Sequence, residues 1–399
     1  MAPSVYYLLM AVVLGLAGNT TAMSLAPYAP PPMYRIRASS LYDAGLQQGQ
    51  LARDRIRGWL ASPEMTALLN YTVTDGASVF AELKETNTAE HSELVAELEG
   101  LAAGADVPLG SVWAATLINE LESLRTNPPP AGHCSDLYAV ADSGAKYHGH
   151  NEDWPGPIRD FWYFVSYTPL PGANFSAVAG AVYPGGLVGW ASSWNAAGIY
   201  FTQNSLFPRK NVPGGVASAF AQRAALCGTG SGVAGHSAAA TTLDEFASRL
   251  VAKPWSSAAS LNIVSLRENR MANVEVHLGL HARHDVAADL GRSANYSHFN
   301  MFKTLEVGLA DAPEPSTVHR QARVDALPPV RNMADIAERL SDDHDRQYPI
   351  YRDMTLHTLV LDGASGVLQG WCCGRRAAVD PPDYHWDLSS FFGQSKLES

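Results

Sequence analysis

The stretch that decides the fold reads Gly-His-Cys-Ser-Asp at residues 132–136, and Gly-His-Asn-Glu-Asp-Trp follows at residues 149–154. Cys134 comes shortly after three consecutive prolines and opens a run of strand-forming residues. A second strand is predicted at about Lys146–Asp153, and it returns polar groups toward the same end. A nucleophile at the start of a buried strand, with a carboxylate on the neighbouring strand, is a sensible catalytic arrangement. We therefore predict that Cys134 becomes a new chain terminus and acts as an N-terminal nucleophile.

Composition places the chain among globular proteins with a substantial core. The 399 residues are 46% hydrophobic and 17% charged, which suits one large domain or two ordinary ones. The formal net charge is -11, and there is no long run of Lys or Arg. Nucleic acid and anionic membrane surfaces are therefore disfavoured as partners.

The N-terminus has the pattern of a targeting segment. Residues 6–18 form one apolar run, and small and polar residues follow it up to Ala22. This run is too short to span a bilayer comfortably, so residues 1–22 are interpreted as a secretory signal peptide, with an uncleaved anchor as the alternative. No later segment reaches 18 apolar residues in a row. The expected location is the secretory pathway, extracellular or lysosomal, with no membrane association after signal removal.

Three Asn-x-Ser/Thr triplets agree weakly with secretion. They begin at Asn70, Asn174 and Asn295. Each is a candidate glycan acceptor if the host is eukaryotic and the site is exposed. The expected product is therefore a secreted glycoprotein.

The four cysteines are too few for a disulfide scaffold. They are Cys134, Cys227, Cys372 and Cys373, and no Cys-x-x-Cys pair is present. A cysteine-based zinc site is not expected. In an oxidising lumen Cys227 has either Cys372 or Cys373 as a disulfide partner, and the sequence leaves that pairing open.

The order of predicted elements favours an α+β layered domain. The first third is helical: residues 43–60 form one helix in which Gly45 and Gly49 allow close packing, residues 90–104 form a second that stops at Gly104, and Ser111 caps a third. Strands and helices then follow without regular βαβ alternation, which argues against a doubly wound sheet. After Cys134 the predicted strands cover residues 161–167, 176–183, 198–203, 261–266, 272–278, 356–362 and 367–371, and the predicted helices cover 216–226, 243–251 and 333–340.

Several familiar catalytic patterns are absent. The sequence has no Gly-x-Ser-x-Gly elbow, His-Glu-x-x-His, P-loop or dinucleotide-binding glycine motif. The acidic run at residues 342–345 is interpreted as a solvated loop at a helix end, because its spacing fits no standard metal cage. No cofactor and no metal site is predicted.

A set of ordered segments carries a family resemblance. The segments are residues 43–60, 97–104, 119–120, 134–136, 149–154, 194–198, 260–262 and 340–344. Through them the chain resembles the isopenicillin N acyltransferase family of N-terminal-nucleophile (Ntn) hydrolases, which includes β-alanyl-dopamine-hydrolase-like amidases. Two positions depart from relatives: His133 stands where glycine often precedes the cysteine, and His150 stands where bile salt hydrolases have arginine.

The resemblance implies a four-layer αββα sandwich, made as a precursor and cut by its own nucleophile between His133 and Cys134. The chain would then divide into a signal peptide at residues 1–22, a helical α-subunit at residues 23–133 and a catalytic β-subunit at residues 134–399. The two subunits would form one Ntn domain, a possible α/β heterodimer.

The chemistry of such a cut follows from pKa values. A free thiol, with a pKa near 8.5, is mostly protonated at neutral pH, whereas a free α-amine, with a pKa of about 7.7–8.0, can serve as the general base beside it. Asp153 is a candidate anchor for that amine, or else a turn carboxylate. His150 is a candidate thiolate or substrate contact, or else a packed strand histidine. The resemblance implies Asn262, and next Asn204, as donors to the oxyanion.

The sequence as a whole predicts a self-processing cysteine hydrolase. Cys134 would form a thioester with the acyl group of a small N-acyl amine or N-acyl amino acid, and water or another amine would receive it. One alternative is a lipid amidase or phospholipase-B-like hydrolase. Another is an uncleaved, secreted Ntn-fold glycoprotein that only binds ligands. A papain-like protease lacks support, because no Cys-Trp signature is present.

Overall fold

The computed structural model describes residues 29–125, 134–208, 210–228, 239–286, 294–307 and 313–393. The helices are α1 (Leu41–Leu51), α2 (Arg53–Leu60), α3 (Pro63–Val73), α4 (Ala77–Glu90), α5 (Ser92–Ala105), α6 (Leu109–Thr116), α7 (Ile118–Arg125), α8 (Ser218–Cys227), α9 (Leu243–Leu250), α10 (Pro315–Asp325), α11 (Met333–Leu340) and α12 (Leu388–Gly393), with a short 3-10 helix at Pro157–Asp160. The strands are β1 (Met33–Ala38), β2 (Ser135–Val140), β3 (Lys146–Asp153), β4 (Tyr163–Pro169), β5 (Val178–Val182), β6 (Ser193–Asn195), β7 (Ile199–Ser205), β8 (Ala258–Ser265), β9 (Arg270–His277), β10 (Leu280–Asp285), β11 (Ala294–His298), β12 (Thr355–Asp362), β13 (Val367–Cys372) and β14 (Tyr384–Asp387).

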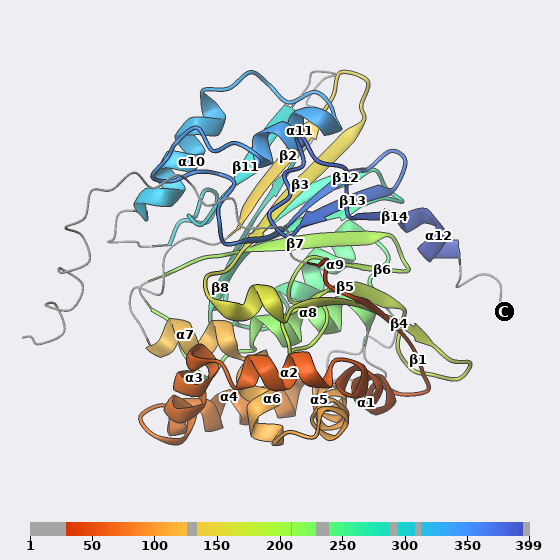
Figure 1. Cartoon of the computed structure of the whole chain (residues 1–399), viewed down its shortest axis with the longest axis vertical. Helices are drawn as coiled ribbons and strands as arrows, with labels where there is room; N and C mark the ends of the chain where they lie inside the picture. The colour runs from red at the N-terminus through yellow and green to blue at the C-terminus, as the bar shows by residue number, and fades with distance from the viewer. Residues whose placement is uncertain are drawn as a thin grey trace, which may run out of the picture.

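Two sheets lie face to face between two layers of helices (Figure 1). The larger sheet has eight strands in the order β1-β4-β5-β6-β7-β8-β9-β10, and the smaller has six in the order β11-β2-β3-β12-β13-β14. Helices α1 to α7 lie beyond the larger sheet, while α10 and α11 cover the outer face of the smaller one (Figure 1). The predicted four-layer αββα sandwich is confirmed. Among the described residues, no helix is both long and apolar enough to cross a membrane.

Helices α1 and α5 pack with their backbones in direct contact. A Cβ atom on Gly45 would lie 2.0 Å from the backbone oxygen of Glu97, and one on Gly49 would lie 2.4 Å from that of Leu101. The reverse holds for Gly100 and Gly104 of α5, whose added Cβ atoms would each lie 2.1 Å from a backbone oxygen of α1. The prediction that Gly45 and Gly49 allow close packing is confirmed, and α5 is the partner.

The helix boundaries in the first third differ from the predicted ones. Residues 43–60 lie in two helices, α1 and α2, that meet at Ala52, and a similar break at Leu117 separates α6 from α7. Gly104 does not stop α5, which ends where Asp106 takes the left-handed conformation with φ of 53°. Ser111 lies inside α6 and is not its N-cap, because that helix begins after Pro108. These helices are shaped by packing more than by local stop signals.

Two of the later helices start and end close to their predicted limits. Helix α11 spans Met333–Leu340 as predicted, and Asn332 caps it by accepting a hydrogen bond from the Asp335 backbone at 2.9 Å. Helix α9 spans Leu243–Leu250, one residue less than the predicted 243–251, and the Thr242 hydroxyl caps it by accepting from the Glu245 backbone at 3.1 Å.

Strand β3 has the predicted limits, and its two faces have different surroundings. A Cβ on Gly149 would lie 2.2 Å from Ile336 of α11, so Gly149 faces the outer helix layer. Side chains alternate along a strand, and His148, His150 and Glu152 therefore face the larger sheet. The structure thus brings polar groups of β3 into the interface between the sheets.

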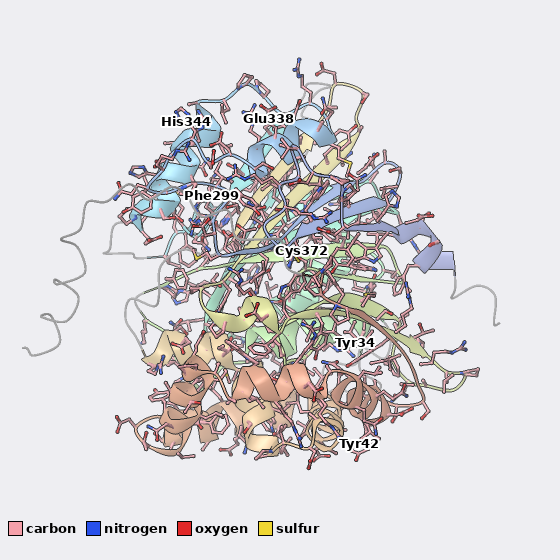
Figure 2. All side chains as sticks on the ribbon, in the orientation of Figure 1. Tyr34, Tyr42, Phe299, Glu338, His344 and Cys372 are labelled. Atoms are coloured by element: carbon pink, nitrogen blue, oxygen red, sulfur yellow. The ribbon has the colours of Figure 1, made fainter. Side chains whose placement is uncertain are left out.

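All four cysteines are free thiols, so neither expected pairing of Cys227 is formed. The Cys227 thiol contacts Arg223 and donates to the Gly228 carbonyl at 3.1 Å. The sulfurs of Cys372 and Cys373 instead lie 2.6 Å from each other. Figure 2 shows Cys372 near the middle of the molecule.

Some predictions concern residues outside the described ranges. They are the signal peptide at residues 1–22, the proline-rich break and His133 before the nucleophile, and most of the loop predicted at residues 228–241. Of the glycan candidates, Asn70 and Asn174 are exposed. Asn295 is exposed too, but both ends of its amide bond the backbone of Val330, at 3.2 and 2.6 Å.

Candidate active site

The candidate site lies on the inner face of the smaller sheet, at the edge where β2 begins and β3 ends. The antiparallel register places Asp136 opposite His150 and Tyr138 opposite His148. Ser135 is opposite Asn151, so Cys134, directly before β2, lies beside Glu152. Side chains alternate along a strand, so two sets of three face the larger sheet side by side. One set is Cys134, Asp136 and Tyr138, and the other is Glu152, His150 and His148 of β3. All six side chains are buried.

Three of these groups form a continuous hydrogen-bonded chain. Asp136 Oδ2 lies 2.8 Å from His150 Nδ1, and His150 Nε2 lies 3.1 Å from Glu152 Oε2. Both carboxylates have further partners: His148 Nε2 is 3.0 Å from Asp136 Oδ1, and the Tyr183 hydroxyl donates to Glu152 Oε1 at 2.7 Å. The imidazole of His150 is thus fixed between two acids.

The charges of this chain follow from its partners. Burial by itself raises the pKa of Asp136, but the charge of His150 and the hydrogen bonds from His148 and His150 hold that pKa well below its usual range. Burial lowers the pKa of His150, yet the Asp136 carboxylate outweighs it and raises that pKa well above its usual value. Burial also acts to raise the pKa of Glu152, and the contacts with His150 lower it overall. The resting state is an imidazolium between two carboxylates.

The Cys134 thiol points at this charged chain. Its Sγ lies 3.6 Å from Glu152 Oε1, and only 3% of the residue is exposed. Burial, and then the charge of Glu152, raise the pKa of the thiol to about 12, although the His150 imidazolium acts in the opposite direction. The resting nucleophile is therefore a protonated thiol, which needs a base before it can attack a carbonyl.

The main chain of Cys134 is held by an arginine that sequence reasoning left without a role. Arg320 of α10 is fully buried and donates to the Cys134 carbonyl at 2.7 Å and to the Ser135 hydroxyl at 2.9 Å. Asn300 in turn accepts from Arg320 at 2.8 Å. Arg323, on the same helix, pairs with Asp342 instead, at 2.7 Å. Arg320 therefore fixes the backbone that carries the nucleophile.

Asp153 lies on the face of β3 opposite His150 and Glu152. Its Oδ1 accepts from the Thr355 hydroxyl at 2.6 Å, and its Oδ2 is 3.8 Å from Arg352. Burial raises the pKa of Asp153, while Arg352 and Thr355 act to lower it. The structure thus separates the two predicted partners of Cys134: His150 is on the thiol side, and Asp153 is on the other face at the end of the strand.

The two asparagines predicted as oxyanion donors lie inside strands and are linked to each other. Asn204 was expected just after the strand predicted at residues 198–203, but it lies within β7, and Asn262 lies in the interior of β8. The Asn262 amide nitrogen donates to Asn204 Oδ1 at 2.8 Å, while the Asn204 nitrogen makes a longer contact, 3.4 Å, with the His298 carbonyl. His298 pairs with Asp136 in the smaller sheet, so this contact crosses between the sheets.

Sequence reasoning missed several residues of the site. Asp136 and Glu152 carried a usable signal, because each lies two residues from a predicted site residue on the same strand face, Cys134 and His150. Tyr183, Arg320 and Arg352 arrive from distant parts of the chain, and no spacing pointed to them.

Among the described residues, one group of three side chains can hold a metal ion. Cys134, His150 and Glu152 each offer one ligand atom, and these atoms lie within 4.8 Å of one another. The acidic loop at residues 342–345 is instead neutralised by neighbours: Asp343 pairs with Arg376 at 3.0 Å, and Asp345 pairs with His319 at 2.7 Å.

Comparison with known proteins gives a family match and distant structural likenesses. The family model for acyl-coenzyme A:6-aminopenicillanic acid acyl-transferase matches residues 140–373, more than half of the 399 residues. The chain is similar to a Caenorhabditis elegans N-acylethanolamine-hydrolyzing acid amidase ortholog, with 10% identity and a TM-score of 0.41 over 58% of this chain and 93% of that one. It is also similar to a mutant conjugated bile acid hydrolase from Clostridium perfringens, with 12% identity and a TM-score of 0.37 over 60% of this chain and 89% of that one. The comparison with curated proteins gives no match.

Proposed function

Because the chain belongs to the acyl-coenzyme A:6-aminopenicillanic acid acyl-transferase family, we propose that it is a cysteine amide hydrolase that matures by cutting itself before Cys134. One observation carries the proposal. The Cys134 thiol is buried against the Asp136–His150–Glu152 chain, while Arg320 holds its carbonyl at 2.7 Å. A cysteine placed only for packing would need neither neighbour.

Maturation begins with attack of Cys134 Sγ on the carbonyl carbon of His133. The bond between that carbon and the Cys134 nitrogen breaks, the nitrogen takes a proton, and a thioester remains. Water then cleaves the thioester and leaves a carboxylate on His133 and a free α-amine on Cys134. Asp153 is the acid that then anchors this amine.

Turnover uses the new amine as the base for the thiol. Transfer of the proton from a thiol with a pKa of about 12 to an amine with a pKa of about 8 costs about 5 kcal/mol. This cost already includes the stabilisation of the thiolate by the His150 imidazolium, without which it would be higher. The thiolate then bonds to the acyl carbon of the substrate, and the bond from that carbon to the substrate nitrogen breaks. The substrate amine leaves with the proton that the Cys134 amine had taken. Water finally releases the acid from the thioester.

Asn204 is our candidate donor to the oxyanion, with Asn262 as the residue that positions it. The sequence favoured Asn262, but its amide nitrogen already donates to Asn204 at 2.8 Å. The Asn204 nitrogen has only the 3.4 Å contact with the His298 carbonyl, so less is lost when it turns to a developing negative charge.

The substrate we propose is a small N-acyl amine or N-acyl amino acid. Hydrolysis is favoured over transfer because water is abundant in a secretory or lysosomal lumen. The apolar N-terminal segment and the exposed Asn70 and Asn174 support that location.

Intact mass and N-terminal sequencing of purified protein test this proposal. Wild type should yield two fragments, one that begins near residue 23 and one that begins at Cys134. Cys134→Ala should remain one chain at the same melting temperature within a few degrees. Cys227→Ala is the matched control, because it removes another buried thiol yet should be cut like wild type. A wild-type chain that stays uncut after long incubation contradicts the proposal and favours an uncleaved binding protein.

A further inference from the structure

Cys134, His150 and Glu152 present the ligand types of a zinc site. Thiolate, imidazole and carboxylate are the side chains that bind Zn²⁺, and all three residues are buried. Their ligand atoms lie within 4.8 Å of one another, on neighbouring positions of β2 and β3. No motif points to this set, because the three residues follow no spacing used by common zinc motifs.

The distances within the set allow one ion to reach all three residues after a small movement of the side chains. Typical Zn–S, Zn–N and Zn–O bonds place neighbouring ligand atoms about 3.3–3.6 Å apart around a tetrahedron. His150 Nε2 lies 3.1 Å from Glu152 Oε2, and one ligand atom from each of the three residues lies within 4.8 Å of the other two. An ion can therefore reach all three atoms once they close in by up to about 1.2 Å.

The partners behind the ligands also match those of zinc sites. A metal-bound histidine usually donates its other ring N–H to a carboxylate, and Asp136 lies 2.8 Å from His150 Nδ1. The Tyr183 hydroxyl donates to Glu152 at 2.7 Å, which leaves the other carboxylate oxygen for a metal. These partners hold the ligand side chains in one orientation before any ion arrives.

We propose that Zn²⁺ binds between Cys134 Sγ, His150 Nε2 and the Glu152 carboxylate and thereby blocks the nucleophile reversibly. Binding releases the thiol proton and the Nε2 proton, so the ion is bound by a thiolate, a neutral imidazole and a carboxylate. Water, or the α-amine of a cut chain, completes the four ligands. The ion is an inhibitor and not a cofactor, because it occupies the sulfur lone pair that the acyl carbon needs.

The site consists of three side chains, so it does not depend on the proposed amidase activity. The test uses purified, reduced and metal-stripped protein with Zn²⁺ or Co²⁺ alone. Calorimetry should give one Zn²⁺ per chain, and Co²⁺ should produce a thiolate charge-transfer absorption. Zn²⁺ should also slow alkylation of Cys134 by iodoacetamide, followed by peptide mass spectrometry. These readouts need no substrate, so their failure is distinct from failure of the amidase proposal.

Variants separate this site from any other. Tyr183→Phe should weaken Zn²⁺ binding by about tenfold or more, and Glu152→Gln should weaken it further. His344→Ala is the matched control: it removes an exposed histidine at the outer edge of the molecule (Figure 2) and should bind Zn²⁺ like wild type. Equal Zn²⁺ affinity in wild type and Cys134→Ala, or alkylation of Cys134 unchanged by Zn²⁺, overturns the proposal. Circular dichroism of each variant establishes that it is folded.

Discussion

The α1–α5 interface and the interface between the two sheets are both buried, but the first consists of backbone contacts and the second contains charged side chains. Four glycines, Gly45, Gly49, Gly100 and Gly104, let α1 and α5 meet backbone to backbone, and the atoms nearest to an added Cβ at each of them are all backbone atoms. Between the sheets, β2 and β3 instead present a chain of two acids, a histidine and a thiol. The first interface depends on shape and the second on charge.

The difference separates stability from chemistry. Close backbone contact gains dispersion energy and needs no desolvated charge. A buried ion pair is weak evidence for stability, because apolar residues of similar volume often do as well. Charges therefore persist in this interface for what they do to the thiol. Substitutions in the first interface should change stability alone, whereas those in the second should change chemistry as well.

Asp136→Asn should have the largest effect, because it removes the charge that keeps His150 protonated. We expect self-cleavage at least about a hundredfold slower. The free energy of unfolding should fall by roughly 3–5 kcal/mol, since one partner of a buried pair is lost. Cleavage is followed by mass spectrometry over time, stability by urea unfolding, and thiolate content by the alkylation rate of Cys134.

Thr202→Val is the control for Asp136→Asn. It removes one hydrogen bond to the Asp136 carboxylate but keeps its charge. Cleavage should slow by less than about tenfold, because one net hydrogen bond is worth about 1 kcal/mol. Equal cleavage and alkylation rates in the two variants would mean that the charge of Asp136 does not act on Cys134.

Gly45→Ala tests the other interface and should affect stability alone. Its Cβ would lie 2.0 Å from the Glu97 backbone oxygen, so one helix must move. The free energy of unfolding should fall by about 1–3 kcal/mol or more, while the cleavage rate of folded protein stays the same. Gly110→Ala is the control, since an added Cβ there has nothing within 4 Å, and α6 should gain up to about 1 kcal/mol. Similar losses in both variants would mean that helix contact is not the cause.

The sequence was most informative where a pattern is local. Strand β3 and helix α11 have their predicted limits, because period-2 and period-3.6 patterns fix short elements well. The breaks at Ala52 and Leu117 lack a glycine or proline signal, and tertiary packing decides them. The four-layer arrangement followed from the family resemblance and not from periodicity.

The site too was predicted only where its residues are close together in the sequence. Cys134 and His150 do lie together, and strand alternation from them would have added Asp136 and Glu152. Arg320 reaches the Cys134 carbonyl from 186 residues away, a distance over which a single sequence holds no readable signal. Asn204 and Asn262 depend on cross-sheet contacts for their relative roles, and those contacts appear only in three dimensions.

Asp244→Asn should have the smallest effect on stability, and it measures how much an exposed charge pair contributes. Arg270 and Arg283 bond Asp244 at 3.0 and 2.6 Å, and these bonds lower its pKa to about 2. A depressed pKa adds stability above the unfolded value of about 3.9, and this contribution disappears as the pH falls toward about 2. Because the carboxylate is 59% exposed, the contribution should stay below about 1 kcal/mol and shrink in salt. The difference in melting temperature between wild type and variant should therefore be small at pH 6 and smaller at pH 3. A difference that is independent of pH, or as large as that of Gly45→Ala, would show that exposed charge pairs stabilise this protein as strongly as helix contacts do.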